Sequence, residues 1–390
     1  MKAFDTYHQS ILPSANRRAE AAQALGNARS LAFQLPCGTA YSYASDGDLV
    51  TISSGSDDAK VVANISEQAF DAYVSQQFSL TGLFYTNQLT LSRGEIAWLL
   101  QWEPALQALY FDRPIWSAAN IADVSELNIN RRFDYSEVQS SAAEMQAFLR
   151  TTGYLHIQNV FNAAEIEAFA SDIEQQKAKA SADDGRSWWA KKSDGEEVCC
   201  RVTYLQRSSE LFAKLPEDPR LQKIAALLGE SLRPVGKRMD GVSVVIKNSD
   251  VVEGMSDLPW HRDCGMGGHH LICPSLNIGI QLDESSAENG QLKFLAGSAN
   301  HANPPVDESI PDLPVAALNA KAGDVSVHLA HVMHIAPPPL GDNGNRRVLY
   351  TSFVKQELID AIPEGQSYND VLFRQGDGRV RTPQERAAES

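Results

Sequence analysis

A histidine and an aspartate two residues apart are the first side chains in this sequence whose types and spacing could do chemistry. His261 and Asp263 lie in the stretch Leu258 to Gly265, and residues i and i+2 of an extended strand project from the same face. An imidazole and a carboxylate on one face are two of the three ligands of the 2-His-1-carboxylate iron site. Because such a short pattern recurs by chance, the alternative is a structural histidine beside a surface aspartate.

The segment from Gly323 to Pro337 supplies the candidates for a second imidazole, which are His328, His331 and His334. If this segment is one regular strand, His328 and His334 share one face and His331 lies on the other. Alternation alone therefore leaves His328 and His334 as alternatives. Arg346 follows them, and a guanidinium is well suited to bind an anionic co-substrate, because it can donate two parallel hydrogen bonds to a carboxylate.

In the order and spacing of these features, the chain resembles the phytanoyl-CoA dioxygenase family of Fe(II)/2-oxoglutarate oxygenases over roughly residues 135–355. The resemblance is carried by Trp260-His261-Arg262-Asp263, the turn from Leu282 to Leu292, Ala296-Gly297-Ser298, Gly323-Asp324, His334 and Arg346. The family places its second histidine ten residues after the aspartate of a Gly-Asp pair, which selects His334. Two positions depart from the family pattern: Ala336, where serine is frequent, and Ala299, where histidine is common.

The resemblance implies that His261, Asp263 and His334 bind Fe(II) and that Arg346 binds the distal carboxylate of 2-oxoglutarate. Asn277 is a further candidate for contact with the co-substrate, and an ordinary interior amide is the alternative. The expected reaction is O2-dependent hydroxylation of a small apolar or amphipathic molecule, with release of succinate and CO2. Related halogenases replace the metal-binding carboxylate with a small residue, so the presence of Asp263 favours hydroxylation.

Two other classes of protein remain as alternatives. One is a non-catalytic protein that binds a lipid or another small molecule on a cupin-type scaffold. The other is a cupin isomerase that uses zinc or manganese and needs neither O2 nor 2-oxoglutarate. The intact pattern around Arg346 argues against both.

The second half of the chain is rich in short β segments separated by glycine, proline and asparagine, which is typical of a sandwich or barrel. These segments lie at residues 242–246, 276–280, 291–294, 324–329 and 348–354, and helices are predicted before them at 162–173 and 218–229. We predict an α+β protein. Its catalytic core, within residues 128–390, is expected to be a double-stranded β-helix of the cupin or jelly-roll kind with flanking helices.

Residues 1–127 are predicted to form a smaller α+β domain, with the boundary in the polar stretch around 128–132. The expected helices lie at 14–26, 66–77 and 95–109, and the expected strands at 41–43, 49–52 and 61–65. This order weakly resembles the sterol-carrier-type lipid-binding fold, which would let the domain receive an apolar substrate.

A long polar connection is predicted over residues 177–197, and it carries the pair Trp188 and Trp189. Connections of this length inside a compact domain are usually functional or disordered. We interpret the segment either as a lid over the substrate or as a loop that its tryptophans pin to the body of the protein.

The composition, with 43% hydrophobic and 21% charged residues, is that of an ordinary globular protein. A formal net charge of -15 argues against a nucleic-acid partner, because like charges repel. Five cysteines without a C-x-x-C pair argue against disulfides and structural zinc and favour a reducing compartment. The sequence shows neither an apolar run of membrane-spanning length nor a signal-peptide core, so we expect a cytoplasmic protein without membrane contact.

Overall fold

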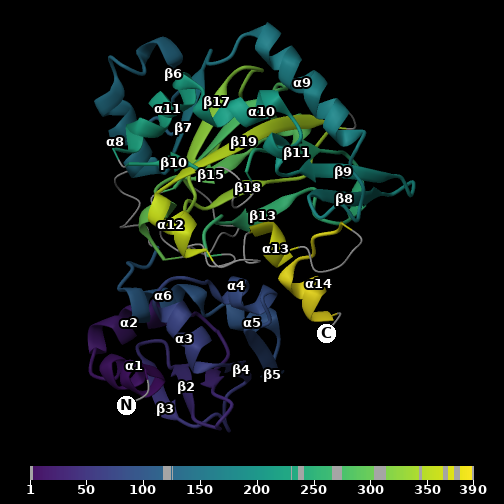
Figure 1. The fold of residues 1–390 in the computed structure, drawn as a ribbon. Helices are drawn as coiled ribbons and strands as arrows, with labels where there is room; N and C mark the ends of the chain where they lie inside the picture. Colours follow the sequence, from purple (N-terminus) through teal and green to yellow (C-terminus); the bar gives the residue numbers. More distant parts are fainter. Residues whose placement is uncertain are drawn as a thin grey trace.

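In the computed structural model, the N-terminal and the C-terminal parts of the chain each combine helices with their own β-sheets (Figure 1). The structure describes residues 3–116, 124, 126–229, 231–235, 241–265, 275–302, 313–341, 345–362, 368–372 and 378–388. Each domain has its own hydrophobic core, one running from Phe4 to Ile115 and the other from Val124 to Phe353. The first core also takes in Ala302, so the C-terminal part of the chain contacts this core at that point.

The N-terminal domain is a five-stranded sheet with the order β3-β2-β1-β4-β5. Its strands are β1 (Leu31–Gln34), β2 (Ala40–Ser45), β3 (Val50–Ser54), β4 (Val61–Ile65) and β5 (Leu89–Arg93). Its helices are α1 (Ala3–Ile11), α2 (Ala15–Gln23), α3 (Glu67–Val74), α4 (Leu80–Tyr85), α5 (Ile96–Leu100) and α6 (Glu103–Phe111). The three strands predicted for this domain are confirmed, while β1, β5 and α1 were not predicted.

The helix predicted over residues 95–109 is two helices, α5 and α6. Pro104 sits in the first turn of α6, where proline is tolerated because the first N–H groups of a helix have no partner within it. The same residue cannot continue a helix that arrives from α5, so the chain breaks at Gln101 and Trp102.

A buried histidine connects helix α1 to the sheet of the N-terminal domain. His8 is fully buried, its Nδ1 donates to the Phe4 carbonyl at 2.6 Å, and its Nε2 accepts from the Tyr43 hydroxyl at 2.5 Å. Burial lowers the pKa of His8 to about 4. The imidazole is therefore neutral in the folded protein at neutral pH.

Acidification should destabilise this protein through His8. The pKa of His8 in the folded state lies below its model value of 6.5, so the unfolded chain binds more protons and stability is lost as the pH falls from about 6.5 to about 4. The full loss in the free energy of unfolding is about 3 kcal/mol. Urea unfolding at pH 7 and pH 4.5 should show this loss, and His8→Gln should reduce the difference between the two pH values. An equal difference in both proteins would contradict the assignment.

The C-terminal domain contains a large, mostly antiparallel sheet with the order β12-β8-β9-β11-β19-β14-β17-β7-β6, and β10 pairs with β19. These strands are β6 (Phe133–Asp134), β7 (Tyr154–Gln158), β8 (Ser187–Lys192), β9 (Glu197–Val202), β10 (Arg233–Pro234), β11 (Ser243–Lys247), β12 (Val251–Glu253), β14 (Leu276–Gln281), β17 (Val325–Leu329) and β19 (Arg346–Val354).

A smaller antiparallel sheet faces it, with the order β13 (Leu258–His261), β18 (His334–Ala336), β15 (Lys293–Leu295) and β16 (Val315–Ala317). The rings of Phe294 on β15 and Tyr154 on β7 stack across the two sheets with centroids 4.6 Å apart. Two facing sheets of short strands form the double-stranded jelly-roll core predicted for this part of the chain.

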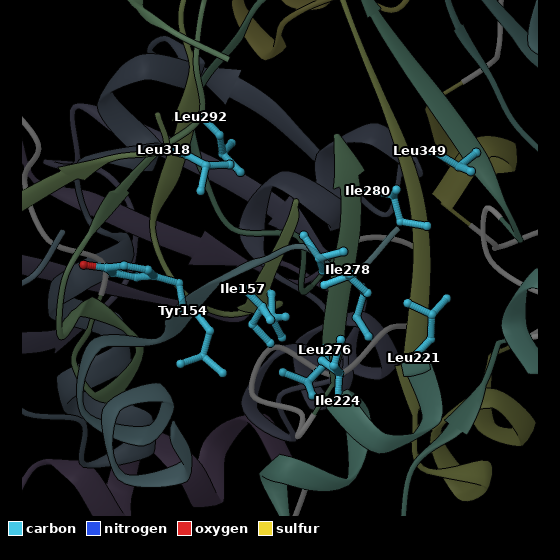
Figure 2. Packing of buried hydrophobic residues seen from close by; sticks show 14 of the residues in the cluster. Tyr154, Ile157, Leu221, Ile224, Leu276, Ile278, Ile280, Leu292, Leu318 and Leu349 are labelled. Atoms are coloured by element: carbon cyan, nitrogen blue, oxygen red, sulfur yellow. The ribbon is translucent and has the colours of Figure 1, made fainter. Parts of the chain in front are cut away.

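Helices cover the outer side of the large sheet (Figure 1). They include α8 (Ala142–Thr152), α9 (Ala163–Lys177), α10 (Glu210–Lys214) and α11 (Pro219–Ala225). Figure 2 shows Leu221 and Ile224 of α11 in the same apolar cluster as Leu276, Ile278 and Ile280 of β14. This packing leaves the opposite face of the sheet directed toward the small sheet. The chain ends with α12 (Gln356–Ala361), α13 (Tyr368–Leu372) and α14 (Pro383–Ala388).

The long polar connection predicted over residues 177–197 is not a loop throughout, because it contains a strand. Residues 187–192 form β8, which pairs with β9 in an antiparallel hairpin. Trp188 is 2% exposed and its Nε1 donates to Asn369 Oδ1 at 3.1 Å, while the backbone N–H of Trp189 donates to the Gly378 carbonyl. Trp188 therefore anchors the hairpin to the body of the domain.

Among the helices of the described ranges, none is long and apolar enough to cross a membrane.

Candidate metal centre

The small sheet brings His261, Asp263 and His334 together. His261 ends β13, His334 begins β18, and the two residues are paired in register across these antiparallel strands. The His261 Nε2 lies 3.4 Å from Asp263 Oδ1, and the His334 Nε2 lies 3.6 Å from Asp263 Oδ2. The three donor atoms all lie within 4.8 Å of one another, which is close enough to coordinate one ion.

Backbone carbonyls fix the orientation of both imidazole rings. The Nδ1 of His261 is 2.7 Å from the Pro259 carbonyl, and the Nδ1 of His334 is 3.0 Å from the Val332 carbonyl. Because a carbonyl only accepts, each Nδ1 carries the proton and each Nε2 keeps its lone pair for a metal. Burial, reinforced by the nearby His261, lowers the pKa of His334 to about 3, so this imidazole is neutral.

The carboxylate of Asp263 is held from the large sheet. Asn277 on β14 donates through Nδ2 to Asp263 Oδ2, and the Ser352 hydroxyl on β19 donates to Asn277 Oδ1 at 2.5 Å. Burial opposes ionisation of Asp263, but the surrounding His334, His261 and His328 outweigh it and hold the pKa of the carboxyl well below its usual range. In this structure Asn277, which was predicted to contact the co-substrate, orients the candidate metal ligand.

His328 also lies beside the carboxylate, with its Nε2 3.3 Å from Asp263 Oδ2. The premise of one regular strand from Asp324 onward is wrong, because β17 ends at Leu329 and the chain turns into the small sheet before β18 begins at His334. Both rings nevertheless reach Asp263, one from each sheet. His334 belongs to the close-spaced donor group and His328 does not.

Arg346 is buried at the start of β19, and its guanidinium is held in place at one edge. Its Nη2 donates to the Gly290 carbonyl at 2.8 Å and its Nε to the Asn289 carbonyl at 3.4 Å. The third nitrogen, Nη1, is buried without a hydrogen-bond partner. A buried guanidinium nitrogen without a partner is costly, and an anionic ligand would satisfy it.

Lys247 is a second buried cation at this site, and sequence analysis missed it. It is paired in register with Arg346 across β11 and β19. Its amine donates to the Ala336 carbonyl at 2.6 Å and to Asp257. Burial lowers the pKa of Lys247 to about 8. A lysine that ends a strand normally indicates a solvated edge, and only the alternation Ser243, Val245, Lys247 hinted that it faces inward.

Comparisons with known proteins identify the family of this sequence. The sequence model described as "Phytanoyl-CoA dioxygenase (PhyH)" matches residues 149–348, which contain all five predicted site residues. An ectoine dioxygenase of Stutzerimonas stutzeri is 28% identical over 162 residues, 41% of this chain and 51% of that protein. A probable alpha-ketoglutarate-dependent hypophosphite dioxygenase of Stutzerimonas stutzeri is 27% identical over 222 residues, 50% of this chain and 73% of that protein. The chain thus spans about half the length of the first of these curated relatives.

Solved structures with a similar arrangement include the non-heme alpha ketoglutarate dependent carbocyclase SnoK from nogalamycin biosynthesis. It is 24% identical, has a TM-score of 0.44, and the match covers 54% of this chain and 83% of that one. EctD from S. alaskensis with bound Fe is 19% identical with a TM-score of 0.44, covering 54% and 76%. The family match spans just over half of the 390 residues and includes the whole donor group. The chain belongs to the phytanoyl-CoA dioxygenase family.

Proposed function

We propose that this protein is an Fe(II)- and 2-oxoglutarate-dependent dioxygenase that hydroxylates a small apolar or amphipathic molecule and releases succinate and CO2. The observation that carries the proposal is the convergence of His261, Asp263 and His334 within 4.8 Å. Two neutral imidazoles and one carboxylate are the donor set of non-haem iron oxygenases. Membership of the phytanoyl-CoA dioxygenase family supports the same activity.

The donor set fits Fe(II) in charge and in chemistry. Asp263 supplies one negative charge, and the two Nε2 atoms are presented by rings whose other nitrogen is already engaged. When bound, the iron supplies open coordination positions at which O2 and a 2-oxo acid react. Asn277 and Ser352 keep the Asp263 carboxylate in one orientation, which is the usual task of groups around metal ligands.

Arg346 is the proposed partner of the distal carboxylate of 2-oxoglutarate. Its free Nη1 is the donor that such a carboxylate would engage, and Lys247 adds a second positive charge next to it. Lys247 is already paired with Asp257, so Arg346 is the cation that we assign to the co-substrate. The large sheet would therefore bind the co-substrate, while the small sheet would hold the metal through its two histidines.

The two-domain division, with a boundary near residue 127, is part of the proposal. The hydrophobic clusters support it, because all buried members of the first cluster except Ala302 lie between Phe4 and Ile115, and the second cluster starts at Val124. A role of the N-terminal domain in receiving an apolar substrate stays a prediction. We also place the protein in the cytoplasm, in keeping with the free thiols of Cys199 and Cys200.

The test is conversion of 2-oxoglutarate to succinate by the purified protein. We expect slow formation of succinate without a primary substrate, dependent on added Fe(II) and on O2. Removal of iron with a chelator should stop it, and Fe(II) but not Zn(II) should restore it. Turnover that survives chelation, or that returns equally with Zn(II), would contradict the proposed function. Candidate substrates are then ranked by how much each accelerates succinate formation.

A further inference from the structure

We propose that the N-terminal domain holds the metal-binding segment of the C-terminal domain in position, with Ser79, Gly82 and Glu103 as positioning residues. The inference rests on the proposed metal centre, but it concerns residues far from the family motifs. The segment in question, His261 to Gly265, carries two of the three candidate ligands. The N-terminal domain contacts it at Gly265.

Ser79 makes the first contact. It caps α4, with its Oγ accepting from the Gly82 N–H at 2.9 Å. The same Oγ donates to the Gly265 carbonyl at 3.0 Å, and the Ser79 backbone N–H donates to that carbonyl at 2.9 Å. Gly265 follows Asp263 by two residues, so two hydrogen bonds from the N-terminal domain fix the backbone next to a candidate ligand.

Gly82 makes the second contact, and its lack of a side chain is essential to it. A Cβ at this position would lie 2.2 Å from the Gly265 oxygen, whereas real Cβ contacts are essentially never below 3.0 Å. Gly82 is within α4 and its φ is not positive, so the helix itself would accept alanine. Glycine is needed here for the close approach of the two domains, not for the backbone conformation.

The opposite side of the ligand is also fixed. The Asp263 N–H donates to the Ala330 carbonyl at 2.8 Å, and Cys264 packs against Ala330. Asp263 is therefore held between the C-terminal domain and the contact of Gly265 with the N-terminal domain. A methyl group on Gly82 would displace Gly265 by about 0.8 Å, and functional groups have to stay within about 0.5 Å of their productive positions.

Charged residues form the third contact. Arg262 lies between the two ligands, and its Nη2 donates to the carbonyls of Ser298 and His301 at 2.9 and 3.0 Å. Arg113 of the N-terminal domain donates to the same His301 carbonyl at 2.8 Å. Glu103 on α6 is 5% exposed; burial raises its pKa to about 7, and the positive charge of Arg262 opposes that shift.

Glu103 accepts a hydrogen bond from Gln107 Nε2 at 3.3 Å through its Oε1. Its Oε2 and the Nε and Nη1 of Arg262 are buried without a hydrogen-bond partner among the described residues. The N-terminal domain thus contacts the backbone of the ligand-bearing segment at Gly265 and influences the charge of its Arg262 side chain.

Binding of Mn(II) alone to the full chain tests this inference. Gly82→Ala should weaken Mn(II) binding roughly 10–100-fold, as expected when a group that orients a metal ligand is disturbed. Ser79→Ala and Glu103→Gln should weaken it in the same direction by a smaller factor. The matched control is Ser66→Ala, which removes the cap of α3 and should leave Mn(II) affinity unchanged.

Isothermal titration without O2 measures the affinity, and the EPR spectrum of bound Mn(II) reports the symmetry of its ligands. Both readouts are independent of turnover. If the protein binds Mn(II) but hydroxylates no substrate, the proposed function is wrong and this test can still be carried out. Affinities and spectra of Gly82→Ala and Ser79→Ala equal to those of the wild type would overturn the inference. If Gly82→Ala does not fold, Ser79→Ala compared with Ser66→Ala decides in the same way, because both lose one helix cap worth about 1 kcal/mol.

Discussion

Replacing Asp263 with alanine should reduce iron-dependent formation of succinate to background. The substitution removes the one anionic donor of the group and leaves the two imidazoles, which bind a divalent ion far more weakly. It also leaves the Asn277 amide without its carboxylate partner. Titration with Fe(II) in the absence of O2 and succinate analysis by mass spectrometry measure the two losses.

Glu284→Ala is the control for Asp263→Ala, because Glu284 is an exposed carboxylate of the same domain. It should bind Fe(II) and turn over as the wild type does. Thermal unfolding adds a second comparison, since a ligand that binds only the folded state raises the melting temperature. Fe(II) should raise that of Glu284→Ala and leave that of Asp263→Ala unchanged. Undiminished turnover by Asp263→Ala would rule out this carboxylate as a ligand.

Much of the candidate metal centre could be predicted because its residues are close in sequence or follow a fixed spacing. His261 and Asp263 are two positions apart, and the spacing from Gly323-Asp324 selected His334. The alternation argument alone did not separate His334 from His328, because it assumed a single strand where the chain turns from one sheet into the other between Leu329 and His334. Both histidines reach Asp263, so alternation failed for a topological reason.

The role of Asn277 and the burial of Trp188 show what a single sequence leaves open. Asn277 was placed correctly near the site, but its hydrogen bond to Asp263 depends on the register between β14 and its neighbours. The polar residues around Trp188 favoured a loop, whereas this tryptophan is buried through a contact with Asn369, 181 positions away. Pairings over such distances leave no local pattern.

The contact between the domains was likewise invisible in the sequence. Ser79 and Gly265 are 186 residues apart. In the sequence, Gly82 indicates only a residue of low helix propensity. Arg262, which alternates with His261 and Asp263, donates to the carbonyls of Ser298 and His301. What the sequence could not provide was the partner on that side, which is the N-terminal domain.

Arg346→Gln should raise the KM for 2-oxoglutarate roughly 30-fold or more, because truncating one member of a buried charge pair costs about 2–5 kcal/mol. The glutamine removes the positive charge and the Nη1 donor that the distal carboxylate would engage. Arg347→Gln is the matched control. Arg347 neighbours Arg346 on the other face of β19, where it pairs with Asp283 and Glu174, and such partly exposed pairs contribute only about 0–1 kcal/mol to stability.

A 2-oxo acid without the distal carboxylate separates recognition from folding in the same experiment. The wild type and Arg347→Gln should strongly prefer 2-oxoglutarate over 2-oxobutyrate, measured as the ratio of kcat/KM values. Arg346→Gln should lose most of that preference, because the carboxylate that distinguishes the two acids no longer has its partner. A damaged fold would lower both kcat/KM values and keep their ratio. A preference retained in Arg346→Gln would therefore assign the distal carboxylate to another cation, and Lys247, paired with Arg346 across the strands, would be the residue to replace next.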